Sequence, residues 1–323
     1  MAGRFCNRLA WAFVLTAFFV CQGNAGQKTY VGNRQTAAER QRQAGEPQFP
    51  FPEIPSALTR PEDRKEFLLK HYWDNFDFSD ISLVDNRDIS EQGFVNQIAL
   101  LADGNTDVEL VRQSIDNFCS GMEKQVHARR IFMDMADDYL YSPGSPFYNE
   151  SLYLIYLKRM AESKALDGVQ KEAVAFRIKL ISRNQPGDKA TDFIYYLPDG
   201  TECSLAATAV KGDRMILVFY DSECESCRET LEQMTDDRAL AEAVVREKVS
   251  VLAVCTEENA EMWRNALARM PPGWIIGEDR GAVKTDALYD LKAMPSIYLL
   301  DKSGRVLLKD ASYEKVREAL HLH

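Results

Sequence analysis

Two spacings of apolar residues divide the chain. Between about residues 61 and 184, apolar residues recur every three or four positions and alternation with period two is almost absent, which is typical of packed amphipathic helices. Beyond residue 185, short apolar runs alternate with helical spacings, which indicates a mixed sheet with helices on both faces. The sequence therefore predicts an all-α region over 61–184 and an α/β region over 185–323.

The all-α region is predicted to contain about six helices. Pro61, followed by two acidic residues, has the chemistry of a first helical turn. A loop is expected over 77–82. The remaining helices are expected from about Ser90 to a stop at Asp103-Gly104, from near Thr106, and over about 122–141, 147–164 and 167–182. No metal or nucleotide motif falls within this region.

The α/β region is organised around the apolar run Met215–Tyr220, which predicts a buried strand. A polar turn, Cys224-Glu-Ser-Cys227 and then helical spacing follow it. The unbroken apolar run 249–255 predicts a second buried strand. Further strands are expected at 191–197, 202–206, 274–276, 296–300 and 305–309, and further helices from Thr256 through Met270, at 283–291 and at 313–320.

Residues 1–25 have the pattern of a secretory signal, with Arg4 and Arg8 ahead of the apolar stretch 9–21. That stretch is shorter than the roughly 20 residues that span a bilayer. Cleavage is expected after Ala25, which predicts an exported, periplasmic protein. Lipid attachment at Cys21 and an uncleaved N-terminal membrane anchor are the alternatives.

Residues 26–60 are rich in glutamine, arginine and then proline. Such a composition cannot bury enough apolar surface to fold alone, so the segment is expected to be an arm or linker. Phe49, Phe51 and Ile54 lie in its second half and are available to pack onto a domain.

The net charge of −10 argues against a nucleic-acid binder. Two of the seven cysteines would leave with the signal, and an odd number that remains cannot all pair within the chain. Only two of them are close in sequence, which argues against a disulfide-stapled scaffold. The five that remain are Cys119, Cys203, Cys224, Cys227 and Cys255.

A Cys-x-x-Cys between a strand and a helix is a redox signature. The spacing places both sulfurs on one face of the first turn, where the helix start stabilises a thiolate at Cys224. Haem attachment would need a histidine where Arg228 stands. Zinc would need further ligands near the pair, and the four histidines lie far away in the sequence. Copper delivery by related folds uses a downstream histidine, and none stands at a suitable place. No metal and no cofactor are expected.

The α/β region resembles the thioredoxin-like superfamily, and within it exported thiol–disulfide oxidoreductases related to cytochrome-maturation thioredoxins. Residues 72–80 resemble part of an uncharacterised helical domain found ahead of such folds. The matching pieces of the α/β region are Gly187-Asp-Lys-Ala-Thr-Asp-Phe193, Asp199-Gly200, Cys224-Glu-Ser-Cys227, Thr256-Glu-Glu-Asn259, Met294-Pro295 and Asp301-Lys-Ser-Gly304.

The resemblance implies roles for particular residues. Cys224 would be the attacking thiolate and Cys227 the resolving thiol. Pro295 would follow a cis peptide bond and face the disulfide. That turn of the backbone would let Met294 pair with an extended substrate segment. Glu223 and Glu225, which flank the nucleophile, would also meet the substrate.

Three positions depart from the family pattern. Glu223 replaces a common tryptophan, Val218 stands where thioredoxin places a buried aspartate, and Thr230 stands where relatives often place a glutamate. Glu223 and Glu225 would oppose thiolate formation. A less stabilised thiolate favours the reduced form less, so the sequence predicts a reductant-like potential.

The leading hypothesis is an exported enzyme that reduces or exchanges protein disulfides and is itself reduced by a membrane-bound electron donor. The alternative is a redox-inactive interaction module with a vestigial dithiol. Peroxide reduction usually places threonine and proline shortly before the cysteine, and neither precedes Cys224 here. Cys255, at the end of a predicted central strand, is either a third redox thiol or a small buried apolar residue.

Overall fold

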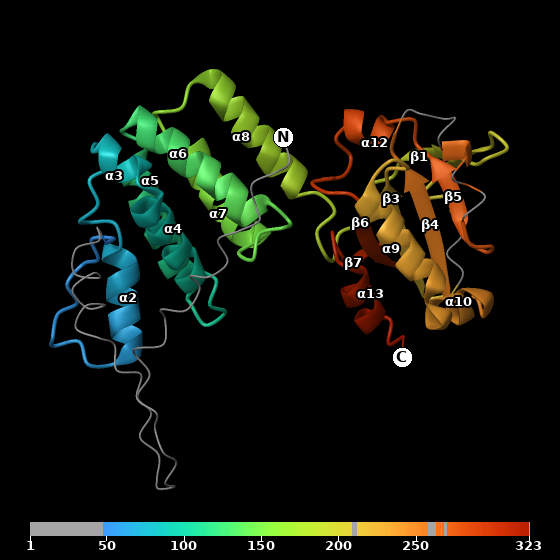
Figure 1. Cartoon of the computed structure of the whole chain (residues 1–323), viewed down its shortest axis with the longest axis horizontal. Helices are drawn as coiled ribbons and strands as arrows, with labels where there is room; N and C mark the ends of the chain where they lie inside the picture. Colours follow the sequence, from blue (N-terminus) through green and yellow to red (C-terminus); the bar gives the residue numbers. More distant parts are fainter. Residues whose placement is uncertain (1–47, 209–211, 258–262, 266, 268–269, 323) are drawn as a thin grey trace, which may run out of the picture. The chain divides into compact units, whose positions relative to one another are not determined.

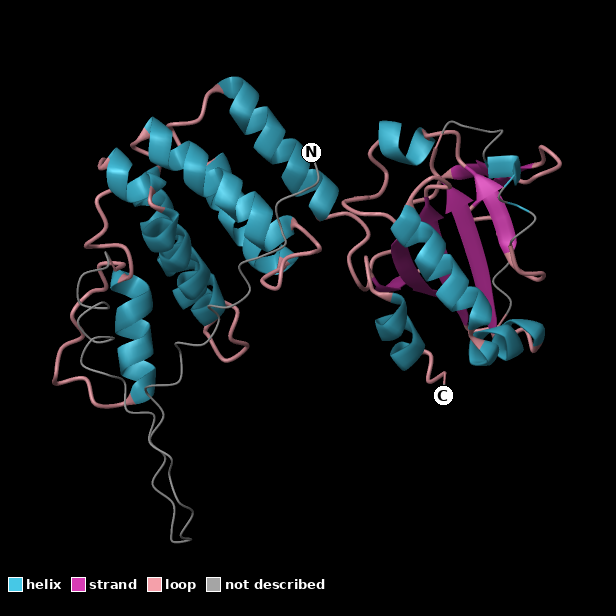
Figure 2. Ribbon diagram, in the orientation of Figure 1, coloured by secondary structure: helices cyan, strands magenta, loops and turns pink. Residues whose placement is uncertain are grey.

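The computed structural model describes residues 48–208, 212–257, 263–265, 267 and 270–322. Residues 48–323 belong to one compact unit. The predicted signal (1–25) and the first part of the predicted arm lie outside the described residues, as does most of the stretch expected to form a helix after Thr256. An all-helical region comes first and a mixed sheet with helices on both faces follows (Figure 2), as predicted.

Seven α-helices and one π-helical turn make up the first region (Figure 1). Asp107, Asn149 and Asp167 cap α5, α7 and α8 with their side chains, each satisfying backbone N–H groups that a helix start leaves free. The helices are α2 Pro61–His71, α3 Ile81–Asp85, α4 Arg87–Leu101, α5 Val108–Met122, α6 Val126–Ala136, η1 Asp137–Tyr141, α7 Glu150–Ala161 and α8 Gly168–Ile181.

The loop prediction for 77–82 was wrong at its end, where α3 begins. The Asp80 side chain accepts hydrogen bonds from the backbone N–H groups of Ser82 and Leu83. This cap starts a helix of five residues, which is too short to show a periodic apolar pattern.

Aromatic rings fill the core of the helical region. Trp73 donates its indole N–H to Gln97, with 2.8 Å between Nε1 and Oε1, so the polar edge of this buried ring has a partner. Phe49, from the predicted arm, is also buried and lies against Gly93 of α4. Phe51 stays half exposed. The arm therefore adds one ring to the core, worth about 1.5–3 kcal/mol of burial.

The second region is a seven-stranded sheet with the order β2-β1-β5-β4-β3-β6-β7. The central strands β3, β4 and β5 run parallel, and β6 is antiparallel to β3. The strands are β1 Ile194–Tyr196, β2 Glu202–Ser204, β3 Arg214–Tyr220, β4 Val249–Cys255, β5 Ile275–Glu278, β6 Ser296–Asp301 and β7 Val306–Leu308.

Alternate side chains of the central strands enter two separate cores. Ile216, Val218 and Tyr220 of β3 pack beneath α9 Glu225–Asp236, α10 Arg238–Val245 and α13 Tyr313–Ala319. The alternate β3 residues Met215, Leu217 and Phe219 pack on the other face of the sheet. This second core also contains Val283 of α12 Ala282–Thr285, Tyr289 and Tyr298. Two covered faces explain why the central strands have continuous apolar runs.

The helix after the dithiol is interrupted at Asp237, where α10 begins without having been predicted. The Asp237 side chain accepts hydrogen bonds from the N–H groups of Ala239 and Leu240. Its other oxygen accepts a hydrogen bond from the hydroxyl of Tyr313 in α13, at 2.8 Å. One aspartate thus starts α10 and ties it to the last helix.

Candidate active site

The strand-to-helix turn after β3 places the two cysteines. Cys224 is the N-cap of α9, and its sulfur accepts a hydrogen bond from the backbone N–H of Cys227, with 3.3 Å between N and Sγ. Cys227 lies in the first turn and is fully buried, while Cys224 is partly exposed. Both are free thiols. The outer sulfur is therefore accessible and the inner one is covered.

The two thiols have opposite electrostatic environments. Partial burial raises the pKa of Cys224, but hydrogen bonds from Ser226 and Cys227 outweigh it, and the pKa lies below its ordinary value. Burial raises the pKa of Cys227 far above the ordinary range, and the nearby Cys224 sulfur raises it further. Cys224 is thus the thiol that ionises first, as expected for a sulfur at a helix start.

The loop before β6 brings Met294 and Pro295 to the dithiol. The peptide bond between them is cis. The carbonyl oxygen of Met294 lies 3.6 Å from the Cys224 sulfur. Pro295 lines a groove of about 280 Å³ together with Thr230, Gln233, Ile297, Ala311, Ser312, Tyr313 and Glu314. Four of the residues singled out from the sequence, Cys224, Cys227, Met294 and Pro295, therefore meet at one place.

Ser226 also belongs to this site, and sequence reasoning missed it. Its Oγ lies 3.0 Å from the Cys224 sulfur and 2.9 Å from the Met294 carbonyl oxygen. The sequence does show a hydroxyl two residues after the first cysteine. It does not show that this hydroxyl contacts Met294, which lies 68 positions away.

Glu223 and Glu225 lie on the exposed surface beside Cys224. Glu225 pairs with Arg228 at 3.3 Å. The carboxylate that raises the pKa of Cys224 is that of Asp221, after the effect of burial and against the hydrogen bonds described above. Asp221 also accepts a hydrogen bond from the N–H of Glu223 at 2.8 Å. Asp221 in the turn therefore opposes thiolate formation at Cys224, which is the effect that the sequence predicts for the two glutamates.

Val218 and Thr230 occupy the places where relatives carry acids. Val218 is fully buried in the same core as Cys227. The Thr230 hydroxyl donates to the backbone carbonyl of Ser226 at 2.9 Å, so it serves the helix. Neither side chain can take a proton from Cys227.

Cys255, at the end of β4, packs in the same core as Cys227 and is paired in register with Tyr220. Its thiol is free and fully buried, and burial raises its pKa. A buried neutral thiol behaves as a small apolar side chain.

Within the part of the chain that the structure describes, no three His, Cys, Asp or Glu side chains are grouped to hold a metal ion. Across the same residues, no helix combines the length and apolar character needed to cross a membrane.

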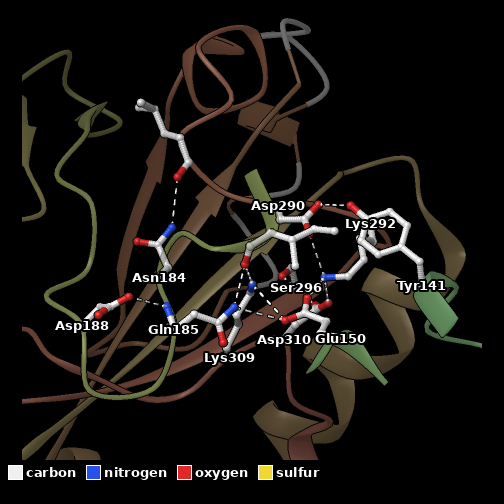
Figure 3. A network of polar contacts seen from close by, with 12 residues as sticks. Tyr141, Glu150, Asn184, Gln185, Asp188, Asp290, Lys292, Ser296, Lys309 and Asp310 are labelled. Atoms are coloured by element: carbon white, nitrogen blue, oxygen red, sulfur yellow. Dashed lines mark hydrogen bonds and ion pairs between the residues drawn. The ribbon is translucent and has the colours of Figure 1, made fainter. Parts of the chain in front are cut away.

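A buried ionic network joins Glu150 to Lys292, two residues before Met294 in the sequence (Figure 3). Lys292 contacts Glu150 of α7 at 2.7 Å, Asp310 at 3.0 Å and Asp290 at 3.1 Å, and only 2% of its side chain is exposed. Lys309 reaches the other oxygen of Glu150 at 3.1 Å. The Tyr141 hydroxyl donates to Asp290 at 2.6 Å. Residues of the helical region thus hold the part of the loop that comes just before Met294.

Comparisons with known proteins follow the same division of the chain. Residues 21–184 match a domain of unknown function, DUF5106, and residues 186–308 match the AhpC/TSA family. A crystal structure of a thioredoxin-like protein from Bacteroides caccae is 34% identical, with a TM-score of 0.72, and the match covers 85% of this chain and 98% of that one.

Shorter structures match part of the chain. A conserved protein of unknown function from Bacteroides fragilis is 37% identical over 42% of this chain and 98% of its own, with a TM-score of 0.40. A thiol-disulfide oxidoreductase from Bacteroides fragilis is 20% identical over 42% of this chain and 98% of its own, with a TM-score of 0.36. The curated proteins give no match.

The likeness over 85% of the chain and the family model over residues 186–308 confirm the predicted fold, an all-helical region followed by a thioredoxin fold. The chain belongs to the thioredoxin-like superfamily, as a member in which a DUF5106 domain precedes an AhpC/TSA-family domain.

Proposed function

We propose that this protein is a thiol–disulfide oxidoreductase that reduces or exchanges disulfides in protein substrates. One observation carries the proposal. An accessible thiol with a lowered pKa lies at a helix start, directly beside a buried thiol with a raised pKa. An attacking and a resolving thiol need this difference, because only the thiolate is nucleophilic.

The reaction would take two steps. The Cys224 thiolate attacks one sulfur of the substrate disulfide, a new S–S bond forms, and the other substrate sulfur leaves with the electron pair and takes a proton. Cys227 then attacks the Cys224 sulfur of this mixed disulfide, and its proton goes to the substrate sulfur that departs. Two electrons pass to the substrate, and the protein retains a Cys224–Cys227 disulfide.

The second step becomes easier once the first has occurred. Burial is the largest cause of the raised pKa of Cys227, and the neighbouring Cys224 sulfur adds to it through its hydrogen bond and its charge. In the mixed disulfide, Cys224 carries no charge, so this addition disappears. Cys227 would then lose its proton more readily, without a buried carboxylate to receive it.

The substrate would bind along the loop before β6. Extended segments bind by pairing their backbone with exposed N–H and C=O groups, and the Met294 carbonyl lies beside the reactive sulfur. The groove at Pro295 continues this surface between α9 and α13. Glu223 and Glu225 are exposed beside Cys224 and would meet the same segment.

We infer export to the periplasm from the signal pattern of residues 1–25. An oxidised dithiol must be reduced again for each turnover, and the sequence contains no flavin or nicotinamide motif. A membrane-bound electron donor would supply these electrons. The helical region would position the substrate or the donor near the dithiol.

Insulin-disulfide reduction in the presence of dithiothreitol tests the activity. We expect the wild type to accelerate the reaction and Cys224→Ser to show only the background rate. Cys203→Ser is the matched control, because this thiol lies in β2, away from the dithiol turn, and its loss should leave the rate unchanged. Equal background rates for all three proteins would contradict the proposal and favour the interaction module.

Trapping with Cys227→Ser tests the order of the two thiols. Without the resolving thiol, Cys224 should remain joined to its substrate as a mixed disulfide. We expect such adducts on non-reducing gels for Cys227→Ser and none for Cys224→Ser. Adducts that accumulate only on Cys227 would reverse the assigned roles.

A further inference from the structure

Three atoms from two separate segments form a small triangle at the reactive sulfur. The Ser226 Oγ lies 3.0 Å from the Cys224 sulfur and 2.9 Å from the Met294 carbonyl oxygen, and the sulfur lies 3.6 Å from that oxygen. Either the thiol or the hydroxyl can be the donor along the first side. The arrangement of protons in this triangle therefore depends on whether the sulfur carries one.

When Cys224 is a thiol, two consecutive hydrogen bonds can supply a donor to the Ser226 oxygen and another to the Met294 carbonyl oxygen. The S–H donates to the Ser226 oxygen, and the Ser226 O–H donates to the Met294 carbonyl. When Cys224 is a thiolate, its sulfur can only accept, and a charged acceptor is preferred to a neutral carbonyl. The single Ser226 proton then turns to the sulfur, and the Met294 carbonyl loses its donor.

We propose that Ser226 is a positioning residue whose hydroxyl donates to the Met294 carbonyl in the thiol form and to the Cys224 sulfur in the thiolate form. Deprotonation of Cys224 thereby frees the Met294 carbonyl to accept a backbone N–H from the substrate. This inference rests on the proposed function, since it assigns the substrate's backbone to that carbonyl.

The coupling works in both directions. A substrate N–H that takes the Met294 carbonyl leaves the Ser226 proton to the sulfur, so binding favours the thiolate, and the thiolate favours binding to the same extent. The Cys224 thiolate and a Met294 carbonyl that is free to accept a substrate N–H would therefore occur in the same state of the site.

The charged groups around Cys224 do not replace Ser226 as a donor to the sulfur. Asp221 at the turn disfavours the thiolate, Cys227 donates its backbone N–H to the sulfur, and the Arg228 guanidinium is held by Glu225. From the Met294 loop, Lys292 is engaged by three carboxylates. In the described structure the Ser226 hydroxyl and the Cys227 thiol are the side-chain donors to the sulfur, and of these two Ser226 also contacts the Met294 carbonyl.

The first test measures the pKa of Cys224 by iodoacetamide alkylation of the reduced full-length protein across a pH series, with modified peptides quantified by mass spectrometry. Ser226→Ala should raise the pKa of Cys224 by about 0.5–1, since a hydrogen bond to a charged group is lost at a partly exposed site. Ser226→Thr keeps the hydroxyl and should restore the wild-type value. Thr235→Val is the control, because it removes a hydroxyl bonded to the Leu231 carbonyl two turns later in the same helix.

The second test follows the carbonyl itself. Labelling with ¹³C-carbonyl methionine and ¹⁵N-proline marks only two Met–Pro pairs, Met294–Pro295 and Met270–Pro271. In the wild type, the Met294 carbonyl resonance should move upfield with the same midpoint as the alkylation of Cys224, because the carbonyl loses its hydrogen bond. The Met270 resonance is the internal control and should not follow that midpoint.

In Ser226→Ala the Met294 resonance should move less than in the wild type as Cys224 titrates, because only the longer 3.6 Å contact with the Cys224 thiol remains to be lost. An unchanged pKa of Cys224 in this variant, or a Met294 resonance that ignores Cys224 in the wild type, would overturn the inference. Neither measurement uses a disulfide substrate. A protein inactive toward insulin can still pass both, and an active one can fail both, so the two proposals can be judged separately.

Discussion

At the scale of single residues, the site combines what the sequence shows with what only the fold supplies. The Cys-x-x-Cys spacing after a buried strand was enough to predict a thiolate at Cys224, because a helix start favours one regardless of the rest of the chain. Ser226 escaped prediction because its partner at position 294 is brought close only by the pairing of β3 with β6. The effect of Asp221 on the pKa of Cys224 was not predicted, because it depends on the path of the backbone between β3 and α9.

The two thiols should therefore titrate far apart. The pKa of Cys224 is lowered, so its alkylation rate should rise with pH through a midpoint below that of an unperturbed cysteine thiol and fall on the acid side as the thiolate is protonated. Cys227, whose pKa is raised by burial and then by Cys224, should stay unreactive through this range. Peptide mapping after timed alkylation of the reduced protein measures both.

The Cys224→Ser variant separates the two causes of the raised pKa of Cys227, which are burial and the neighbouring Cys224 sulfur. Cys227 should remain slow in this variant, because burial is the larger cause of its raised pKa. Rapid alkylation of Cys227 near neutral pH would contradict that order of causes.

At the scale of elements, prediction succeeded where one face or two faces of an element are buried over several residues. The ranges predicted for β3 and β4 match the structure closely, since both strands are apolar on both faces. The first strand was predicted over 191–197 and spans only Ile194–Tyr196. Strand β1 pairs with β5 at one position only, so few ladder bonds define its ends. Helices that begin at one capping aspartate, such as α3 and α10, have too few residues to show a periodic apolar pattern.

The contact of the arm with α4 can be tested at Gly93. A Cβ at this position would collide with the ring of Phe49, and overpacking of a core costs about 1–3 kcal/mol. Gly93→Ala should therefore lower the free energy of unfolding by about that amount in urea titrations.

Two companions make this measurement specific. Gly104→Ala meets nothing within 4 Å and should be nearly neutral. In a Phe49→Ala background, the penalty of Gly93→Ala should shrink, because the ring it strikes is gone. An equal penalty in both backgrounds would mean that the arm does not pack there.

At the scale of the whole molecule, the buried network of Figure 3 joins residues far apart in sequence. Two lysines and three carboxylates share it, and their side chains are between 2% and 14% exposed. No pattern in the sequence predicts it, because each of these residues is an ordinary charged residue until its partners are known. Buried charges of this kind depend on their partners, since removing one leaves another uncompensated.

Removing Glu150 should be costly. Glu150→Ala would leave Lys309 without its carboxylate and Lys292 with one fewer, and we expect a loss of about 3–5 kcal/mol in the free energy of unfolding. Glu66→Ala removes a carboxylate from an exposed pair with Lys70 and should cost less than about 1 kcal/mol. Urea unfolding of both variants provides the comparison. Similar small losses in the free energy of unfolding would show that the buried network does not contribute to stability.

The same network gives stability a pH dependence on the acid side. Burial raises the pKa of Glu150, but Lys292 and Lys309 outweigh it and the net pKa is lowered. A carboxyl with a lowered folded pKa stabilises the protein above its unfolded pKa of about 4.3, and this stabilisation is lost as the pH falls through the folded value. Urea midpoints measured from pH 7 downward should fall less steeply in Glu150→Gln than in the wild type.

The separation of these partners along the chain also sets an order of events during synthesis. Lys292 and Lys309 follow Glu150 by 142 and 159 residues, which at about 5–20 residues per second is a delay of roughly 7–30 seconds. Until Lys292 has been made, Glu150 lacks both lysines of the network. Lys309 follows the last hairpin of the sheet, so a chain that ends before this hairpin would have Lys292 as the remaining lysine partner of Glu150 in the network.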